Sequence, residues 1–139
     1  MTAITSYTNF VTNLAGLTIT GVTKKNVFPP LALNTADLPT SWVEIPSGEE
    51  GAMTLTATGG WPIFRAALVV AVEAVAQEQQ VTNWTSVLTM LDNVSKALRA
   101  TVPGTTLVRG GISWSIRVVI KTVSGIDYWA VAADVEGYG

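Results

Sequence analysis

The longest apolar run in the chain predicts the central strand of a sheet. Residues 66–76 are apolar at every position except Glu73. Their many valines are β-branched, which favours a pleated strand over a buried helix, and Gly59-Gly60 supplies a turn signal before the run. In a strand, alternate residues face opposite sides of the sheet, so both faces of this one are apolar. One face carries Ala66, Leu68, Val70 and Val72, and the other carries Ala67, Val69 and Ala71.

Two segments carry apolar residues at the spacing of a helix. The first covers residues 2–14 and the second covers residues 84–100, where the apolar stripe is longest. Thr82 or Asn83 is expected to cap the second helix, and Val102-Pro103-Gly104 ends it. We expect both helices to lie side by side on one face of the sheet, covering the central strand.

Shorter alternating patterns predict the remaining strands. Residues 52–58 are expected to lie between strand 41–46 and the central strand, as the middle of a three-stranded meander. A proline-rich crossing leads into strand 41–46, and residues 136–139 are expected to be a frayed end. The strands predicted outside the apolar run are 17–22, 41–46, 52–58, 112–121 and 128–135.

The element order is therefore α-β-β-β-β-α-β-β. Hairpin signals between neighbouring strands favour an α+β fold over α/β. The sequence predicts a single domain over residues 1–139, with a mostly antiparallel sheet of about six strands and two helices packed on it.

The composition indicates that part of the surface of the folded chain is buried in a contact with another molecule. Apolar residues make up 48% of the chain and charged residues only 13%, about half the usual charged fraction. Self-association is the simplest explanation, since permanent interfaces are depleted in charge. The alternative is a well-packed monomer with a surface rich in threonine and serine. The net charge of −2 argues against a dedicated nucleic-acid binder, and no segment has the pattern of a signal peptide or a membrane span.

Most catalytic chemistry is excluded by residue type. The chain has neither histidine nor cysteine, which removes histidine-dependent acid–base and nucleophilic catalysis and ordinary zinc sites. We expect no catalytic, cofactor-binding or metal-binding residues, and no enzyme activity. The one unusual acid is Glu73, inside the apolar run. It is read either as a residue at a strand end or subunit contact, or as a carboxylate that, like Glu44, serves a hydrolase.

Other candidate motifs have ordinary explanations beside functional ones. Gly59-Gly60 and Gly110-Gly111 lack the pattern of a phosphate-binding loop and are read as turns. The basic pair Lys24-Lys25 and the acidic tip Glu49-Glu50 are typical of solvated loops. Five tryptophans are candidates for a sugar-stacking platform, although most lie in predicted strands, where a core or an interface is the simpler reading. They are Trp42, Trp61, Trp84, Trp114 and Trp129.

Three stretches resemble the tail terminator and neck (head–tail joining) proteins of tailed bacteriophages. The first is the opening helix, a short strand and the crossing VFPPLALNTADLPTSWVEI at 27–45. The second is the apolar strand 65–75 followed by the helix 84–100. The third is the closing hairpin, with Tyr128-Trp129 and an acidic end. These are patterns of order and composition that together cover nearly the whole chain.

The resemblance implies a structural virion protein, assembled in the host cytoplasm, that forms a homohexameric ring at the head-proximal end of a phage tail. Such a ring ends tail-tube polymerisation and joins the tail to the head connector, so its partners are the tail tube protein and a head-completion protein. Genomic DNA passes through the lumen without specific binding, and no membrane is involved. The expected contact residues are Lys24, Lys25, Glu49, Glu50 and Arg109. The alternatives are another neck or tail-tube component, or a carbohydrate- or ligand-binding module.

Overall fold

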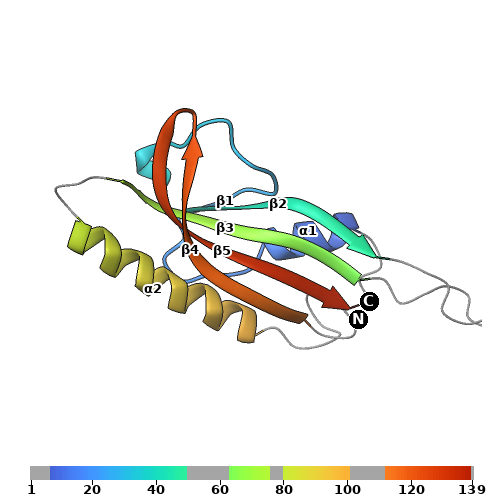
Figure 1. The fold of residues 1–139 in the computed structure, drawn as a ribbon. Coiled ribbons are helices and arrows are strands. Elements are labelled where there is room, and N and C mark those ends of the chain that lie inside the picture. Colours follow the sequence, from blue (N-terminus) through green and yellow to red (C-terminus); the bar gives the residue numbers. More distant parts are fainter. Residues whose placement is uncertain (1–6, 50–62, 76–79, 101–111, 139) are drawn as a thin grey trace, which may run out of the picture.

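The apolar run forms the central strand of the structure, a computed structural model that describes residues 7–49, 63–75, 80–100 and 112–138. This strand, β3 (Ile63–Ala74), lies in the middle of a five-stranded sheet with the order β1-β2-β3-β5-β4 (Figure 1). Neighbouring strands run antiparallel, except β1 and β2, which are parallel. The other strands are β1 (Lys24–Lys25), β2 (Thr40–Glu49), β4 (Ile112–Val123) and β5 (Ile126–Tyr138).

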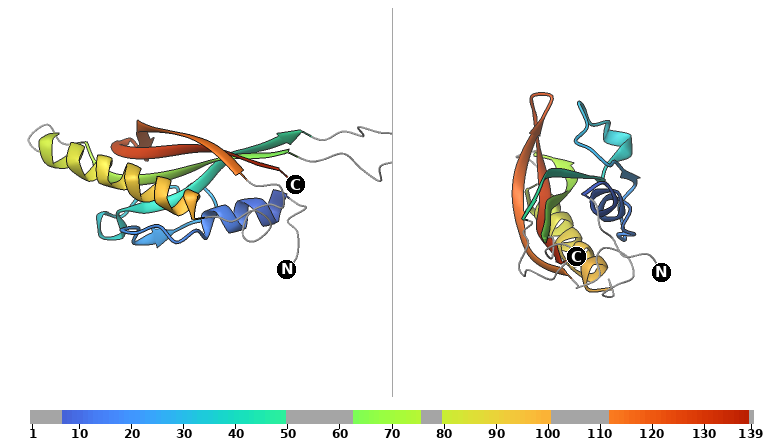
Figure 2. Two further views of the ribbon diagram at one scale, coloured as in Figure 1. Left: turned by 90° about the horizontal axis from the view of Figure 1, so that it is seen from below. Right: turned by 90° about the vertical axis from the view of Figure 1, so that its right-hand side faces the viewer.

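Two helices cover one face of this sheet. Helix α1 (Tyr7–Ala15) packs on β2 and β3, and α2 (Gln80–Arg99) packs on β3, β4 and β5 (Figure 2). A short 3-10 helix, η1 (Thr35–Asp37), lies in the crossing between β1 and β2. The predicted α+β fold, with a mostly antiparallel sheet and both helices on one face, is confirmed.

The two faces of β3 separate the core as the alternation predicts. The cluster on the helix side contains Phe10 of α1 and Val87 of α2, and the cluster on the opposite side contains Trp42 and Tyr128. The opposite side is rich in alanine, so that Trp42 supplies much of its volume. From β3, the helix-side cluster takes Ala66, Leu68, Val70 and Val72, and the opposite cluster takes Ala67, Val69 and Ala71.

The described sheet has five strands rather than about six, and the element order is α-β-β-β-α-β-β. The strand predicted at 17–22 is absent. Leu17 and Ile19 are buried there in alternation with exposed threonines, as the pattern requires, but the segment pairs with no described strand. Instead, Asn93 of α2 donates to the Thr20 carbonyl at 2.9 Å. The alternation therefore records burial under the helices and not sheet pairing.

The predicted meander is also corrected. Residues 52–58 lie outside the described residues, and β2 itself pairs with β3, with Trp42 opposite Val69. The predicted frayed end is wrong up to Tyr138, because β5 extends that far. Its residue Gly137 pairs with Phe64 on one side and with Ile112 on the other.

Helix α2 begins at Gln80, four residues before its predicted start at Trp84. Asn83 therefore lies within the first turn and does not cap the helix. Its side-chain amide donates to the carbonyl of Ala74, at the end of β3, at 3.3 Å. This contact joins the start of the helix to the end of the central strand.

Two irregularities change which way side chains face. In β2, a register shift between Glu44 and Ser47 accompanies a left-handed backbone at Ile45 (φ 52°), and Ile45 is exposed instead of facing the core with Val43. In β3, a register shift between Ala71 and Glu73 brings Glu73 opposite Trp129. Paired residues share a face of the sheet, and Trp129 packs on the helix side, so this bulge turns Glu73 toward α2.

Candidate functional site

Lys24 and Lys25, two of the predicted contact residues, form β1 at one edge of the sheet and are exposed. The Lys24 amine lies 3.5 Å from an oxygen of Asp37, and the Lys25 amine donates to the Gly16 carbonyl at 3.3 Å. The ion pair is worth at most about 1 kcal/mol, since both side chains are well solvated. These contacts tie the edge strand to its own chain.

The acidic tip lies far from this basic pair. Glu49 ends β2, opposite Ile63, whereas Lys25 pairs with Ser41 near the start of the same strand. The spacing of residues in a strand separates the two positions by roughly 25 Å. Glu50 and Arg109 lie outside the described residues. Within one chain the structure therefore does not bring the basic pair and Glu49 together, and their contact role stays a prediction.

The two acids considered for a hydrolase lie on opposite faces of the sheet. Glu44 shares its face with Trp42 and uses both carboxylate oxygens: Oε2 accepts from the Trp42 indole N–H at 2.9 Å, and Oε1 pairs with the Lys121 amine. Glu73 faces α2 on the other side. They do not form the paired carboxylates that glycoside hydrolysis uses.

Replacing Glu44 with alanine is expected to lower the free energy of unfolding by about 1–3 kcal/mol, because the buried Trp42 indole and the Lys121 amine lose their acceptor. Urea unfolding measures the loss. The matched control is Asp134→Ala, which removes the Arg117 ion pair, where both side chains are 54% exposed. That change is expected to cost at most about 1 kcal/mol. Equal losses in the two variants would contradict a supporting role for Glu44.

The described tryptophans do not form one platform. Trp42 is buried on the face away from the helices, whereas Trp114 and Trp129 are partly buried on the helix side. Trp84 stacks edge-on against Trp129, with ring centroids 6.0 Å apart. Trp61 lies outside the described residues. Tryptophans on opposite faces of a sheet cannot stack against one sugar chain.

Exposed apolar side chains gather along the β4 edge of the sheet, in what we call the β4 surface: Trp84, Leu88 and Ile120. Their exposed fractions are 49%, 39% and 53%. Trp129 joins them, because it pairs with Ile120 across the β4–β5 hairpin and stacks on Trp84. Strand β4 is the last strand in the described sheet, so its outer edge has no strand partner there.

A second exposed apolar group, the crossing surface, lies at the opposite edge of the sheet. It consists of Val27, Phe28 and Leu31, which directly follow β1 and are 44%, 73% and 95% exposed. The crossing lies beside β1 and β2, whereas β4 is at the far end of the strand order. The sheet is curled, so the hairpin end of β4 comes near the crossing on the face away from the helices (Figures 1 and 2). One chain therefore presents apolar side chains at both edges of its sheet.

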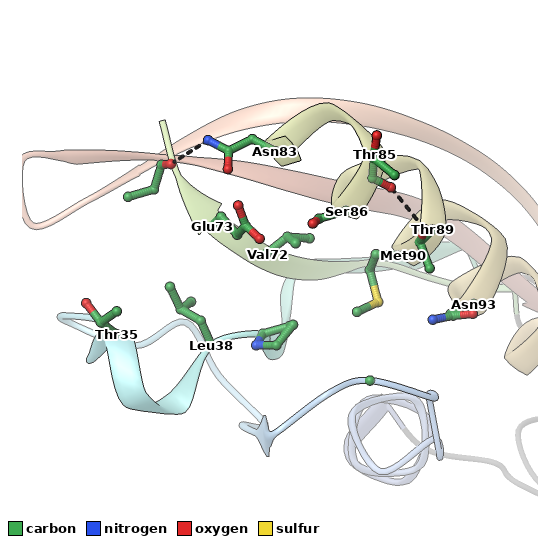
Figure 3. Close-up of a pocket in the computed structure, with 13 residues that line it drawn as sticks. Thr35, Leu38, Val72, Glu73, Asn83, Thr85, Ser86, Thr89, Met90 and Asn93 are labelled. Atoms are coloured by element: carbon green, nitrogen blue, oxygen red, sulfur yellow. Dashed lines mark hydrogen bonds between the residues drawn. The ribbon is translucent and has the colours of Figure 1, made fainter. Parts of the chain in front are cut away.

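A cleft of about 640 Å³, the α2 cleft, opens between the first half of α2 and the crossing (Figure 3). It exists because β3 is longer than its neighbour: β2 begins at Thr40, opposite Ala71, so residues 72–74 of β3 have no β2 partner. Leu38, Val72 and Met90 give it apolar walls. Its volume is in the range of small-ligand sites.

Most polar groups of the α2 cleft come from β3 and α2, and Thr35 of η1 adds a hydroxyl from the crossing. Glu73, turned by the bulge, projects from β3, and Asn83 and Ser86 project from the first turns of α2. Asn83 is 1% exposed, and its Oδ1 has no hydrogen-bond partner in the structure. Sequence reasoning singled out Glu73 and Asn83 separately but missed that they meet, because a strict two-residue period places Glu73 on the other face.

The comparisons add no family assignment: no family model matches the chain, and no curated protein matches it. In the described ranges, no histidine, cysteine or acidic side chains gather in threes where a metal ion would fit. None of the described helices combines the length and apolar character needed to cross a membrane. The features of the described residues that bear on function are therefore the two apolar surfaces and the α2 cleft.

Proposed function

We propose that this chain is a structural protein that assembles into a ring at the head-proximal end of a bacteriophage tail. The observation that best supports ring assembly is the pair of exposed apolar surfaces, β4 and crossing, at opposite edges of one sheet. A monomer gains nothing from six large apolar side chains in water, and clusters of this kind mark interaction sites.

The placement of the two surfaces favours head-to-tail contacts. If the β4 surface of one copy packs on the crossing surface of the next, each copy uses both surfaces and the contact repeats. Such a heterologous contact closes into a ring when the rotation per subunit divides a full turn. The low charged fraction of 13% agrees with subunits that bury much of their surface.

The position at a phage tail rests on the resemblance of the chain to tail terminator and neck proteins. The opening helix, the proline-rich crossing, the long apolar strand with its following helix and the closing hairpin carry that resemblance. In this role the ring ends tube polymerisation and binds a head-completion protein on its other side. Another neck or tail-tube component is the second candidate, and the same apolar surfaces suit it.

The first test is the absolute mass in solution, by light scattering behind size exclusion over a range of concentrations. We expect a species near six times the chain mass of 14.7 kDa. Added to polymerised tail tube protein of the same virion, this species is expected to bind one tube end and stop growth, as electron microscopy reports. A monomer at every soluble concentration, together with no effect on tubes, would overturn the proposal.

A further inference from the structure

The α2 cleft contains a hydrogen-bond acceptor that its surroundings identify. The Asn83 amide nitrogen donates to the Ala74 carbonyl at 3.3 Å. This hydrogen bond identifies the amide atom that faces Ala74 as the nitrogen, since an oxygen in that place would be repelled by the carbonyl oxygen. Oδ1 is therefore directed the other way, on the side of Glu73 (Figure 3), where it has no partner. A buried acceptor without a donor is destabilising, and a donor entering the cleft removes that penalty.

Two more acceptors lie around the same space. Glu73 brings a carboxylate from the β3 bulge, and Ser86, one turn after Asn83, brings a hydroxyl (Figure 3). The torsion that orients an asparagine amide is soft, so a small rotation presents Oδ1 to an entering N–H. A ligand group that hydrogen-bonds to all three acceptors needs several N–H donors, and a single positive charge on it balances the Glu73 carboxylate.

The walls of the cleft indicate what carries that charge. Leu38, Val72 and Met90 line it with carbon and sulfur, so a ligand with an apolar stem and a cationic head fits better than a bare ion. Lysine and arginine side chains have this form, because their methylene stems pack on apolar surface while the head finds polar partners. We propose that the α2 cleft binds the cationic side chain of a lysine or arginine from a second copy of this chain.

The choice of a second copy rests on the proposed ring. Lys96 is exposed on the last turn of α2 and forms no ion pair among the described residues, not even with Asp92 one turn earlier on the helix. It lies thirteen residues after Asn83 along the helix, roughly 20 Å away, so it cannot reach its own cleft. A cation at one end of α2 and an acceptor cleft at the other end suit a repeated head-to-tail contact.

The chemistry of the cleft is tested without any assembly. The ¹⁵N-labelled full chain is titrated with n-butylammonium while the side-chain amide signals of Asn83 are followed by NMR. We expect saturable shifts at millimolar concentration, because so small a ligand binds weakly. Butyltrimethylammonium has the same charge but no N–H donor and is expected to leave these signals unchanged. Equal shifts with both cations, or none with either, would overturn the proposal.

Two variants assign the binding to named groups. Glu73→Gln keeps the shape but removes the charge, and it is expected to weaken n-butylammonium binding about tenfold. Asp92→Asn makes the same change on the exposed face of α2, outside the cleft, and is expected to have no effect. Ser86→Ala, which leaves the charge in place, is expected to give a smaller loss than Glu73→Gln. Equal affinity in Glu73→Gln and Asp92→Asn would contradict the site.

The source of the cation is tested separately. Lys96→Met is expected to weaken self-association about tenfold by light scattering, with the n-butylammonium affinity of the cleft unchanged. Unchanged association would overturn the neighbouring copy as the source. If the chain is a monomer at all concentrations, the proposed function fails, while the n-butylammonium titration still decides whether the cleft binds an alkyl cation.

Discussion

Replacing Phe64 with alanine is expected to lower the free energy of unfolding by about 3–5 kcal/mol, the usual loss for a fully buried phenylalanine. Phe64 is 0% exposed. Its ring stacks on Phe10 with centroids 5.6 Å apart and meets Tyr7 edge-on at 5.0 Å. These contacts join α1 to the first residues of β3, so the cavity left by the change would open under the shorter of the two α-helices, which is the less able to form alone.

The matched control is Phe28→Ala, which removes the same side chain from the crossing, where it is 73% exposed. That variant is expected to stay within about 0.5 kcal/mol of the unchanged chain. Both variants are compared by urea unfolding at a concentration where light scattering shows only the monomer, because Phe28 belongs to the proposed subunit contact and association adds to apparent stability. A loss below about 1 kcal/mol in Phe64→Ala would contradict the packing of α1 on β3.

The sequence predicts the centre of this fold well, because a strand that is buried on both faces is apolar at nearly every position. The run around Val69 and Val70 could satisfy its apolar side chains only in the middle of a covered sheet, and that is where β3 lies. The same logic failed at Leu17 and Ile19, where alternation marks side chains buried under helices. A pattern of burial does not by itself specify hydrogen-bond partners.

The bulges could not be predicted from the same patterns. A bulge inserts one residue without a distinctive residue type, and it breaks the alternation of side chains between the two faces of the strand. At Ile45, a side chain that strict alternation places on the same face as the buried Val43 is exposed, and at Glu73 an acid moves to the helix side. The α2 cleft depends on the second bulge and on the early start of α2 at Gln80, so sequence reasoning placed its residues on separate elements without bringing them together.

The predicted contact residues show a related limit. Exposed charges such as Lys24 and Lys25 are conspicuous in a chain with few of them, but the structure engages both with their own subunit. The apolar side chains of the β4 and crossing surfaces were less conspicuous, because an exposed leucine or tryptophan cannot be told from a core residue by its type. Three-dimensional placement at opposite sheet edges is what makes them candidates for subunit contacts.

Replacing Ile120 with lysine is expected to abolish the proposed ring while leaving the fold intact. Ile120 is 53% exposed at the centre of the β4 surface, so the monomer accommodates a solvated amine there. In a packed contact the same amine is buried beside Trp84 and Leu88 without a partner, and a charge on an edge strand also opposes pairing with another chain. We expect association to weaken at least a hundredfold, as for a central interface residue. Light scattering gives the mass, and circular dichroism checks the fold.

The matched control is Ile126→Lys. Ile126 is 50% exposed in the same hairpin but pairs with Val123, which packs against the cluster away from the helices, so this change is expected to leave the mass of the ring unchanged. Loss of the ring in both variants would mean that added charge alone prevents assembly, and a ring that survives Ile120→Lys would show that the subunits meet through another surface.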